Sequence, residues 1–237
     1  RTEQGVPVYA VEREDLFDRP NLYGNAAGDY YDNLERFAFF CRAALLACGE
    51  MGFVPDVVHC HDWQTGLIPS ILGASFPESA SVFTIHNLGY QGLFPADRLP
   101  ATGLSADRHF HPEGVEYWGG ISLLKAGIVY ADAVTTVSPT YAAEIRTPEF
   151  GMGLEGVLRN RGNVLHGILN GADYARWDPR ADPFLPARYG PGRMAGKMQC
   201  KKRWSVPTPP SAVPLNRSIN LPIGKRLTTS LWPTTTP

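Results

Sequence analysis

Two short apolar runs, DVVHC at residues 56–60 and SVFTI at residues 81–85, decide the fold expected for this chain. The first is followed by HDWQTG at 61–66 and the second by HNLGYQG at 86–92. Such short runs, rich in β-branched residues and ended by turn formers, are typical of buried strands in a parallel sheet, with a helix at residues 67–72 between them. In these sheets ligands collect beyond the carboxyl ends of the strands, so we place the candidate site there.

Further apolar segments extend this pattern along the chain. Helices are expected at residues 33–51, 119–130, 139–145 and 154–161, and further strands at residues 6–11, 133–137 and 164–169. Residues 15–31 are expected to form a loop. Strands that alternate with helices predict an α/β fold with a parallel sheet and right-handed crossovers.

Charge and proline are distributed unevenly along the 237 residues. The formal net charge is −1, yet residues 1–182 carry 13 basic and 23 acidic side chains, whereas residues 183–237 carry nine basic and no acidic ones. The later segment also holds ten of the 21 prolines. We therefore expect a folded domain at residues 1–190, and at residues 191–237 a linker remnant and a disordered, basic, Pro- and Thr-rich tail.

Cysteine usage and hydropathy bear on location. The four cysteines are scattered and form no CxxC pair, which favours a reducing compartment and a cytoplasmic location. Neither a signal peptide nor an apolar run long enough to cross a bilayer is evident. We expect no membrane and no nucleic acid as partner, and the sequence leaves the oligomeric state open.

Polar residues that fall just past the expected strand ends form the candidate site. They are Asp62, His86, Asn87, Ser138 and Asn170. Carboxylate, amide and imidazole groups make directional hydrogen bonds to hydroxyl groups. Trp63, Tyr90 and the tyrosines of LYGNAAGDYYDN (residues 22–33) could offer ring faces to sugars, although packing of these loop tyrosines on the core is as good an interpretation. Such a crevice suits a polyhydroxylated ligand.

Other site types fit the sequence less well. His59, His61 and Asp62 suggest a metal site, but no further ligand stands at a familiar spacing, so we expect no metal. GMGLEG at residues 151–156 matches the GxGxxG dinucleotide fingerprint, which would indicate a nicotinamide-dependent oxidoreductase. A helix and not a strand is expected before it, so this alternative is weak. The absence of GxSxG and GxxxxGK[ST] argues against serine hydrolases and P-loop hydrolases.

Five collinear motifs resemble the bacterial glycogen synthase and starch synthase family. They are PDVVHCHDWQTGL (55–67), FTIHNLGYQGLFP (83–95), GISLLKAGIVYADAVTTVSPTYAAEI (120–145), GLEGVLRNR (153–161) and GILNGAD (167–173). The resemblance covers roughly residues 6–197. It implies two Rossmann-like domains of the GT-B type, of which residues 1–190 would be most of the amino-terminal one. It also implies transfer of glucose from ADP-glucose to the non-reducing end of an α-1,4-glucan with retention.

The resemblance assigns roles to individual residues. Asp62 and His86 would be catalytic, facing the donor glucose and the reaction centre together with Asn87. Asn170 would lie beside the donor, and Tyr30 or Tyr31 near the acceptor glucan. The resemblance implies no metal ion and no cofactor besides the ADP-glucose substrate.

The sequence also departs from the family. The Lys-x-Gly-Gly-Leu loop and the second domain, which would bring cations to the diphosphate, are absent from it. We therefore expect an incomplete chain that is inactive or nearly so alone, with a non-catalytic glucan-binding remnant as the alternative. After Lys202 the sequence leaves the family pattern, and we hypothesise a frameshift near Cys200; a natural basic tail that binds polyanions is the other interpretation.

Overall fold

The computed structural model describes residues 5–205. Residues 9–170 form one compact unit, and the described residues before and after them, 5–8 and 171–205, belong to a second. The compact unit contains every strand and all helices but one of the described chain. It ends before residue 190, so the domain boundary expected there stays a prediction.

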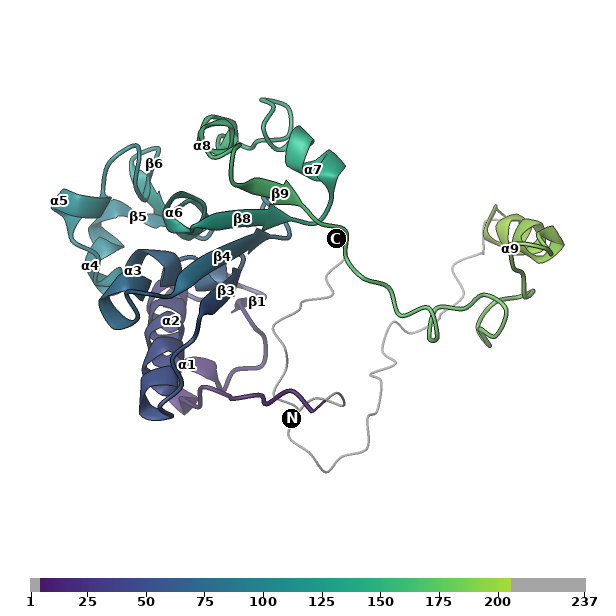
Figure 1. Ribbon diagram of the computed structural model, residues 1–237, viewed down its shortest axis with the longest axis horizontal. Helices are drawn as coiled ribbons and strands as arrows, with labels where there is room; N and C mark the ends of the chain where they lie inside the picture. The colour runs from purple at the N-terminus through teal and green to yellow at the C-terminus, as the bar shows by residue number, and fades with distance from the viewer. Residues whose placement is uncertain (1–4, 206–237) are drawn as a thin grey trace. The chain divides into compact units, whose positions relative to one another are not determined.

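A four-stranded parallel sheet lies at the centre of the compact unit (Figure 1). In spatial order its strands are β3 (Val57–His61), β4 (Ala80–Ile85), β8 (Ala133–Thr136) and β9 (Leu165–Gly167). The register places His61 beside Thr84 and Thr84 beside Thr135. Because all neighbouring pairs are parallel, the four strands end at the same edge. The predicted parallel α/β fold is confirmed.

Each connection between neighbouring strands of the parallel sheet contains helices. They are η1 (Trp63–Thr65), α3 (Ile68–Ser75), η2 (Ala96–Arg98), α4 (Leu99–Thr102), α5 (Ala106–His109), α6 (Leu123–Tyr130), α7 (Pro139–Glu144) and α8 (Glu155–Asn160). Helix α6 packs closely on the sheet, since a Cβ on Gly127 would lie 2.3 Å from the Phe83 ring. Gly66 is needed for a similar reason, because a Cβ there would meet the carbonyl oxygen of Leu123. Phe83, Ile85 and Val134 are completely buried on this face.

An antiparallel three-stranded sheet is inserted between β4 and α6 (Figure 1). Its strands, in spatial order, are β5 (Leu93–Pro95), β7 (Gly120–Ser122) and β6 (Glu116–Tyr117). The sequence had predicted one helix over residues 119–130, and its first part is wrong. Ile121 pairs with Phe94 across the small sheet, and the Ser122 hydroxyl caps α6 by accepting a hydrogen bond from the Lys125 nitrogen at 3.1 Å.

The segment before β3 consists of helix α1 (Glu14–Phe17), the two-residue strands β1 (Gly24–Asn25) and β2 (Gly28–Asp29), and helix α2 (Asn33–Glu50). Leu34, Phe37, Cys41 and Leu45 recur at helical spacing on α2 and are buried, which confirms the helix predicted there. The strand predicted at residues 6–11 is not formed. A strand needs a hydrogen-bonding neighbour, and these residues pair with no strand in the part of the chain that the structure describes.

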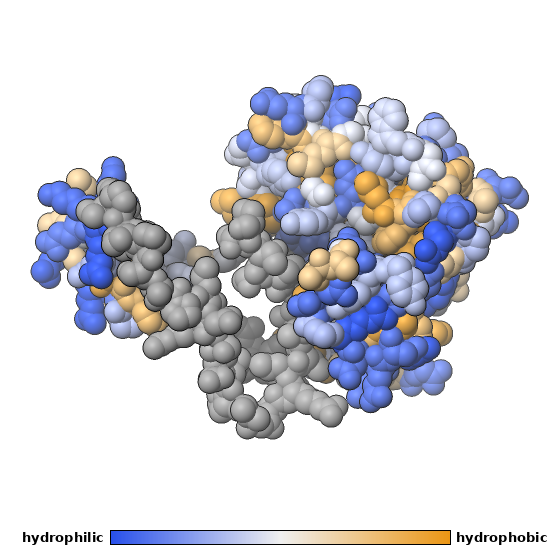
Figure 2. Space-filling view, turned by 180° about the vertical axis from the view of Figure 1, so that it is seen from behind, coloured by the Kyte–Doolittle hydropathy of each residue, from blue (hydrophilic) through white to orange (hydrophobic). Residues whose placement is uncertain are grey.

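In the described residues of the second unit, 5–8 and 171–205, there is one helix, α9 (Ala195–Ser205). The disordered tail had been expected at residues 191–237. Its first part contains α9, and residues 206–237 lie outside the described residues. None of the helices described between residues 5 and 205 is long and apolar enough to cross a membrane. Apolar side chains nevertheless reach the surface, as the orange areas among blue ones in Figure 2 show. Phe53, Val54 and Val57, before and at the start of β3, are among the exposed ones.

Candidate functional site

The ends of β3 and β4 are joined through Asp62. Its backbone nitrogen donates a 3.0 Å hydrogen bond to the carbonyl oxygen of Thr84, and its carboxylate accepts one of 2.8 Å from the backbone nitrogen of His86. Asp62 has a φ of +54°, in the left-handed region that most side chains avoid. This conformation and the two hydrogen bonds fix the carboxylate at the carboxyl edge of the sheet, where the sequence had placed it.

Three histidines lie together at this edge. The Nδ1 atom of His61 is 3.0 Å from Nε2 of His86, and the rings of His59 and His61 are 4.2 Å apart between centroids. A hydrogen bond between two ring nitrogens requires that one donates and the other accepts, so the two rings cannot both be doubly protonated. The sequence had named His86 as a site residue, whereas it had considered His61 only as a possible metal ligand.

Partial desolvation favours the neutral form of these imidazoles, although the side chains of His59 and His61 also reach solvent. This desolvation lowers the pKa of His61 to about 4, with smaller contributions from the neighbouring His59 and His86. The pKa of His59 and of His86 is lowered for the same main reason. Burial also raises the pKa of Asp62, opposed by the hydrogen bond from the His86 nitrogen. A neutral imidazole can both donate to and accept from a hydroxyl group, which suits a sugar ligand.

Threonines extend this polar cluster across the sheet. The Oγ1 atom of Thr84 is 2.6 Å from Nε2 of His59 and 2.5 Å from Oγ1 of Thr135. His61, Thr84 and Thr135 occupy neighbouring register positions on the face opposite to Phe83. The alternation of polar and apolar residues in β3 and β4 was visible in the sequence, and it could have identified Thr84 as part of this face.

Asn87, Tyr90 and Asn170 lie along the same edge. The Oδ1 atom of Asn87 accepts a hydrogen bond of 2.9 Å from the Gly89 nitrogen and so shapes its own turn. Tyr90 is 62% exposed. Asn170 is exposed and follows β9. The pairing of β9 with β8 continues one residue past β9, because the Ile168 nitrogen donates a 2.8 Å hydrogen bond to the Thr136 oxygen. Parallel pairing thus puts all three on the side of the sheet where Asp62 and His86 lie.

Trp63 takes a different position from the one expected of a sugar platform. It is 8% exposed, and its ring packs at 4.7 Å from Phe37, with Tyr23 and Phe94 each at 6.0 Å between centroids. A Cβ on Gly92 would also touch this ring. The indole therefore fills the core behind the edge. Because other aromatic side chains surround it, it has little area left for a ligand.

Tyr30 and Tyr31 have contrasting environments. Two guanidinium groups lie near the Tyr30 ring, with the Arg19 carbon at 4.8 Å and the Arg36 carbon at 5.2 Å from its centroid. Tyr31 is 85% exposed. Of the two, Tyr31 has the free ring area that a glucan needs, whereas Tyr30 packs in the loop.

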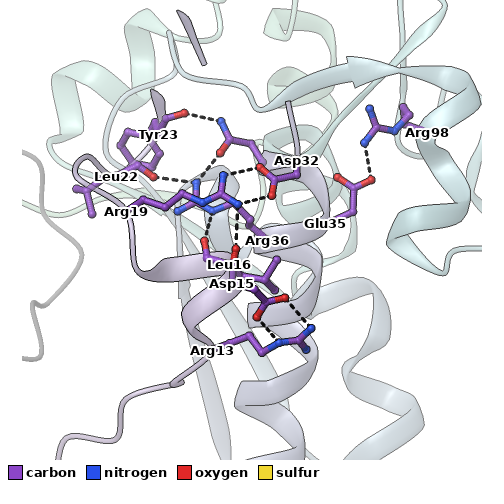
Figure 3. A network of polar contacts seen from close by, with 11 residues as sticks. Arg13, Asp15, Leu16, Arg19, Leu22, Tyr23, Asp32, Glu35, Arg36 and Arg98 are labelled. Atoms are coloured by element: carbon purple, nitrogen blue, oxygen red, sulfur yellow. Dashed lines mark hydrogen bonds and ion pairs between the residues drawn. The ribbon is translucent and has the colours of Figure 1, made fainter. Parts of the chain in front are cut away.

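Arg36 holds that loop in place (Figure 3). It is buried and donates hydrogen bonds to the carbonyl oxygens of Leu16, at 2.7 Å, and Leu22, at 2.9 Å. Arg19 pairs with Asp32 at 2.6 Å beside it. The only sequence signal for this network was an arginine next to Phe37 on the apolar stripe of α2.

Two alternatives from the sequence can be compared with the structure. Within residues 5–205, no group of three or more His, Cys, Asp or Glu side chains is arranged to hold a metal ion. The GxGxxG match at residues 151–156 follows α7 and its last two residues begin α8, so no strand leads into it, as the sequence predicted. Ser138 caps α7, because its hydroxyl accepts a 2.9 Å hydrogen bond from the Tyr141 nitrogen.

Comparison with known families decides the assignment. The family model described as "Starch synthase catalytic domain" matches residues 1–160. The chain belongs to this family. It is 48% identical over 206 residues to a glycogen synthase of Syntrophotalea carbinolica, covering 84% of this chain and 42% of that protein. It is 50% identical over 220 residues to glycogen synthase 2 of Geobacter sulfurreducens, covering 89% and 45%.

A solved structure supports the same family and its GT-B fold. The catalytic domain of starch synthase IV from Arabidopsis thaliana, bound to ADP and acarbose, superimposes with a TM-score of 0.63 at 35% identity. The match covers 75% of this chain and 38% of the plant chain. The chain thus spans less than half the length of these relatives, and the family resemblance seen in the sequence is confirmed.

Proposed function

We propose that the compact unit forms one wall of a retaining glucosyltransferase site, which transfers glucose from ADP-glucose to the non-reducing end of an α-1,4-glucan. The observation that carries this proposal is the Asp62–His86 hydrogen bond at the carboxyl edge of the sheet in a member of the starch synthase family. The ADP and acarbose bound to the plant neighbour support a nucleotide and a carbohydrate as ligand classes.

The chemistry assigns a part to each group at the edge. In retaining glucosyl transfer, positive charge develops on the sugar ring while negative charge grows on the departing ADP. The fixed Asp62 carboxylate stabilises the positive charge on the sugar ring and accepts hydrogen bonds from sugar hydroxyls. The neutral His86 ring orients a hydroxyl of the donor glucose, with Asn87 and Asn170 beside the donor and Tyr31 toward the acceptor.

Transfer at this site would need no metal ion and no cofactor. We further propose that the protein acts in the cytoplasm, with ADP-glucose and glucan as its partners. The groups at the edge are a carboxylate, amides and neutral imidazoles, none of which neutralises a diphosphate. The departing ADP therefore requires cations from elsewhere in a complete enzyme. We expect this chain alone to transfer no measurable glucose.

A chimera tests the proposal directly. Residues 9–170 would replace the matching segment of the Geobacter sulfurreducens glycogen synthase 2, and incorporation of labelled glucose from ADP-glucose into glycogen would be measured. We expect an active chimera, and a loss of at least about 100-fold in kcat for Asp62→Asn and for His86→Asn. His166→Asn, an exposed histidine on β9, is the matched control and should retain activity. A folded but inactive chimera would contradict the proposal.

Glucan binding without turnover is the second candidate, favoured by the exposure of Tyr31 and Tyr90. Affinity of the chain for maltooligosaccharides in the absence of nucleotide, together with an inactive chimera, would support it over the first.

A further inference from the structure

Trp118 is held in a strained conformation that exposes its indole. Its φ is +50°, which costs a residue with a Cβ roughly 1–2 kcal/mol, yet the side chain is 84% exposed and so gains little from burial. Strain of this kind persists only where the surrounding structure enforces it, and it gathers at binding sites. An indole presented to solvent at such a cost needs an explanation other than packing.

The surroundings enforce the strain from both sides. The Gly119 nitrogen donates a 2.7 Å hydrogen bond to the Glu116 carboxylate, which closes the turn around Trp118. The Tyr117 hydroxyl donates one of 2.7 Å to the carbonyl oxygen of Met152. Met152 also has a left-handed backbone, with a φ of +48°, so this contact joins one strained residue to the residue that precedes the other, Trp118. These two hydrogen bonds hold the turn from which the indole projects.

A hollow of about 260 Å³ opens beside the indole. Glu116, Tyr117, Lys125, Gly153 and Val157 are among the residues that line it with Trp118. It is smaller than the roughly 300–1,000 Å³ of pockets for drug-sized ligands. It therefore has room for a small group such as one sugar ring.

The polar groups of the hollow suit a neutral ligand. The Lys125 side chain is 4% exposed and donates to the carbonyl oxygens of Pro112 and Glu116, which leaves one N–H for a ligand hydroxyl. The Glu116 carboxylate offsets the Lys125 charge, so the hollow has no excess of positive charge for a phosphate. An aromatic face with a few hydrogen-bonding groups is the chemistry that binds a pyranose ring.

The hollow is connected to the candidate site. The Gln91 side chain donates a 3.0 Å hydrogen bond to the same Met152 carbonyl oxygen that Tyr117 contacts. A Cβ on Gly89 would lie 3.6 Å from the Met152 sulfur. The loop after β4, which carries His86 and Tyr90, thus packs against the Met152 loop, and the Met152 loop packs against Tyr117 and Trp118.

We propose that the Trp118 hollow is a further carbohydrate-binding subsite, in which a glucose unit of a glucan stacks on the indole and hydrogen-bonds to Lys125 and Glu116. The choice of a glucan over another carbohydrate rests on the proposed function. The subsite holds a chain that extends beyond the edge where Asp62 and His86 lie, and it takes no part in the transfer step itself.

The test measures maltoheptaose binding to the full chain, without nucleotide, by calorimetry and by tryptophan fluorescence. We expect Trp118→Ala to weaken binding about tenfold or more, as for other aromatic anchors, and to remove the fluorescence change. Trp118→Tyr should retain part of the affinity. Trp177→Ala is the matched control, because Trp177 is also exposed, at 70%, and lies outside this hollow. Trp118→Gly, which accommodates the left-handed backbone, is the second variant should Trp118→Ala fold poorly.

The outcomes separate this proposal from the proposed function. Equal affinities of the parent chain and Trp118→Ala, or no maltoheptaose binding by the parent at millimolar concentration, would overturn the subsite. An inactive chimera together with Trp118-dependent binding would overturn the proposed transfer and leave the subsite standing. Inorganic phosphate that competes with maltoheptaose at the hollow would overturn the assignment of a neutral ligand.

Discussion

The backbone nitrogen of His86 donates a 2.8 Å hydrogen bond to the carboxylate of Asp62, although the two residues belong to the ends of different strands. This bond links the two motifs that the sequence had placed at one edge. Because Asp62 also has a positive φ, the contact and the backbone conformation depend on each other. Both can be tested through stability.

Asp62→Ala should lower the free energy of unfolding by about 1–3 kcal/mol, because the His86 nitrogen loses its acceptor. Asp62→Asn should cost less than about 1 kcal/mol, since its amide oxygen still accepts and asparagine tolerates a left-handed backbone. Urea unfolding followed by circular dichroism gives both values. Equal losses for the two variants would show that the hydrogen bond does not stabilise this edge.

The histidine pair should make stability depend on pH. Burial lowers the pKa of folded His61 to about 4, below the ordinary value of about 6.5 in an unfolded chain. Between these values the unfolded state binds more protons, so stability should fall as the pH drops from about 6.5 to 4 and should not depend on this group above that window. Asp62 has the opposite effect, because its pKa is raised in the folded state. Its contribution to stability should fall as the pH rises through its titration.

Urea midpoints at several pH values between 4 and 7.5 measure this dependence. His61→Asn should flatten it, and His166→Asn, which lies outside the pair, is the control. An unchanged slope in His61→Asn would exclude the pair as its source.

Trp118→Gly should leave stability unchanged or raise it by up to about 1 kcal/mol. Relief of the left-handed strain is partly offset by the greater freedom of glycine in the unfolded chain. Gly119→Ala is the converse change, with a φ of +81° and no atom within 4 Å of the new Cβ. It should lose about 1–2 kcal/mol through the backbone alone. Thermal unfolding checks both variants, and a marked loss in Trp118→Gly would mean that the indole packs after all.

Gly127→Ala should destabilise the compact unit by about 1–3 kcal/mol, because its Cβ would overlap the Phe83 ring between α6 and β4. Gly156→Ala is the matched control within a helix. No atom lies within 4 Å of its new Cβ, so it should gain about 0.4–1 kcal/mol from lower unfolded-state freedom. Denaturant midpoints compare the pair, and similar shifts in both would contradict the close packing of α6 on the sheet.

Much of the fold followed from local pattern. The apolar runs around Cys60 and Phe83 became neighbouring parallel strands, and the helical spacing of Leu34, Phe37 and Leu45 became α2. The errors came where pairing overrode local preference. Ile121 joined a strand because Phe94 was there to pair with it, and residues 6–11 formed no strand because no neighbour was available within the described chain.

The amino-acid sequence by itself determined the four strands of the parallel sheet and the polar residues Asp62, His86 and Asn170 that follow three of them, because the spacing of apolar and polar residues is a local property. Only the tertiary structure decided that His61 contacts His86, that Trp63 lies in the core and that Trp118 faces solvent. These outcomes depend on register and on packing between segments far apart in the chain, and no short stretch of residues encodes either.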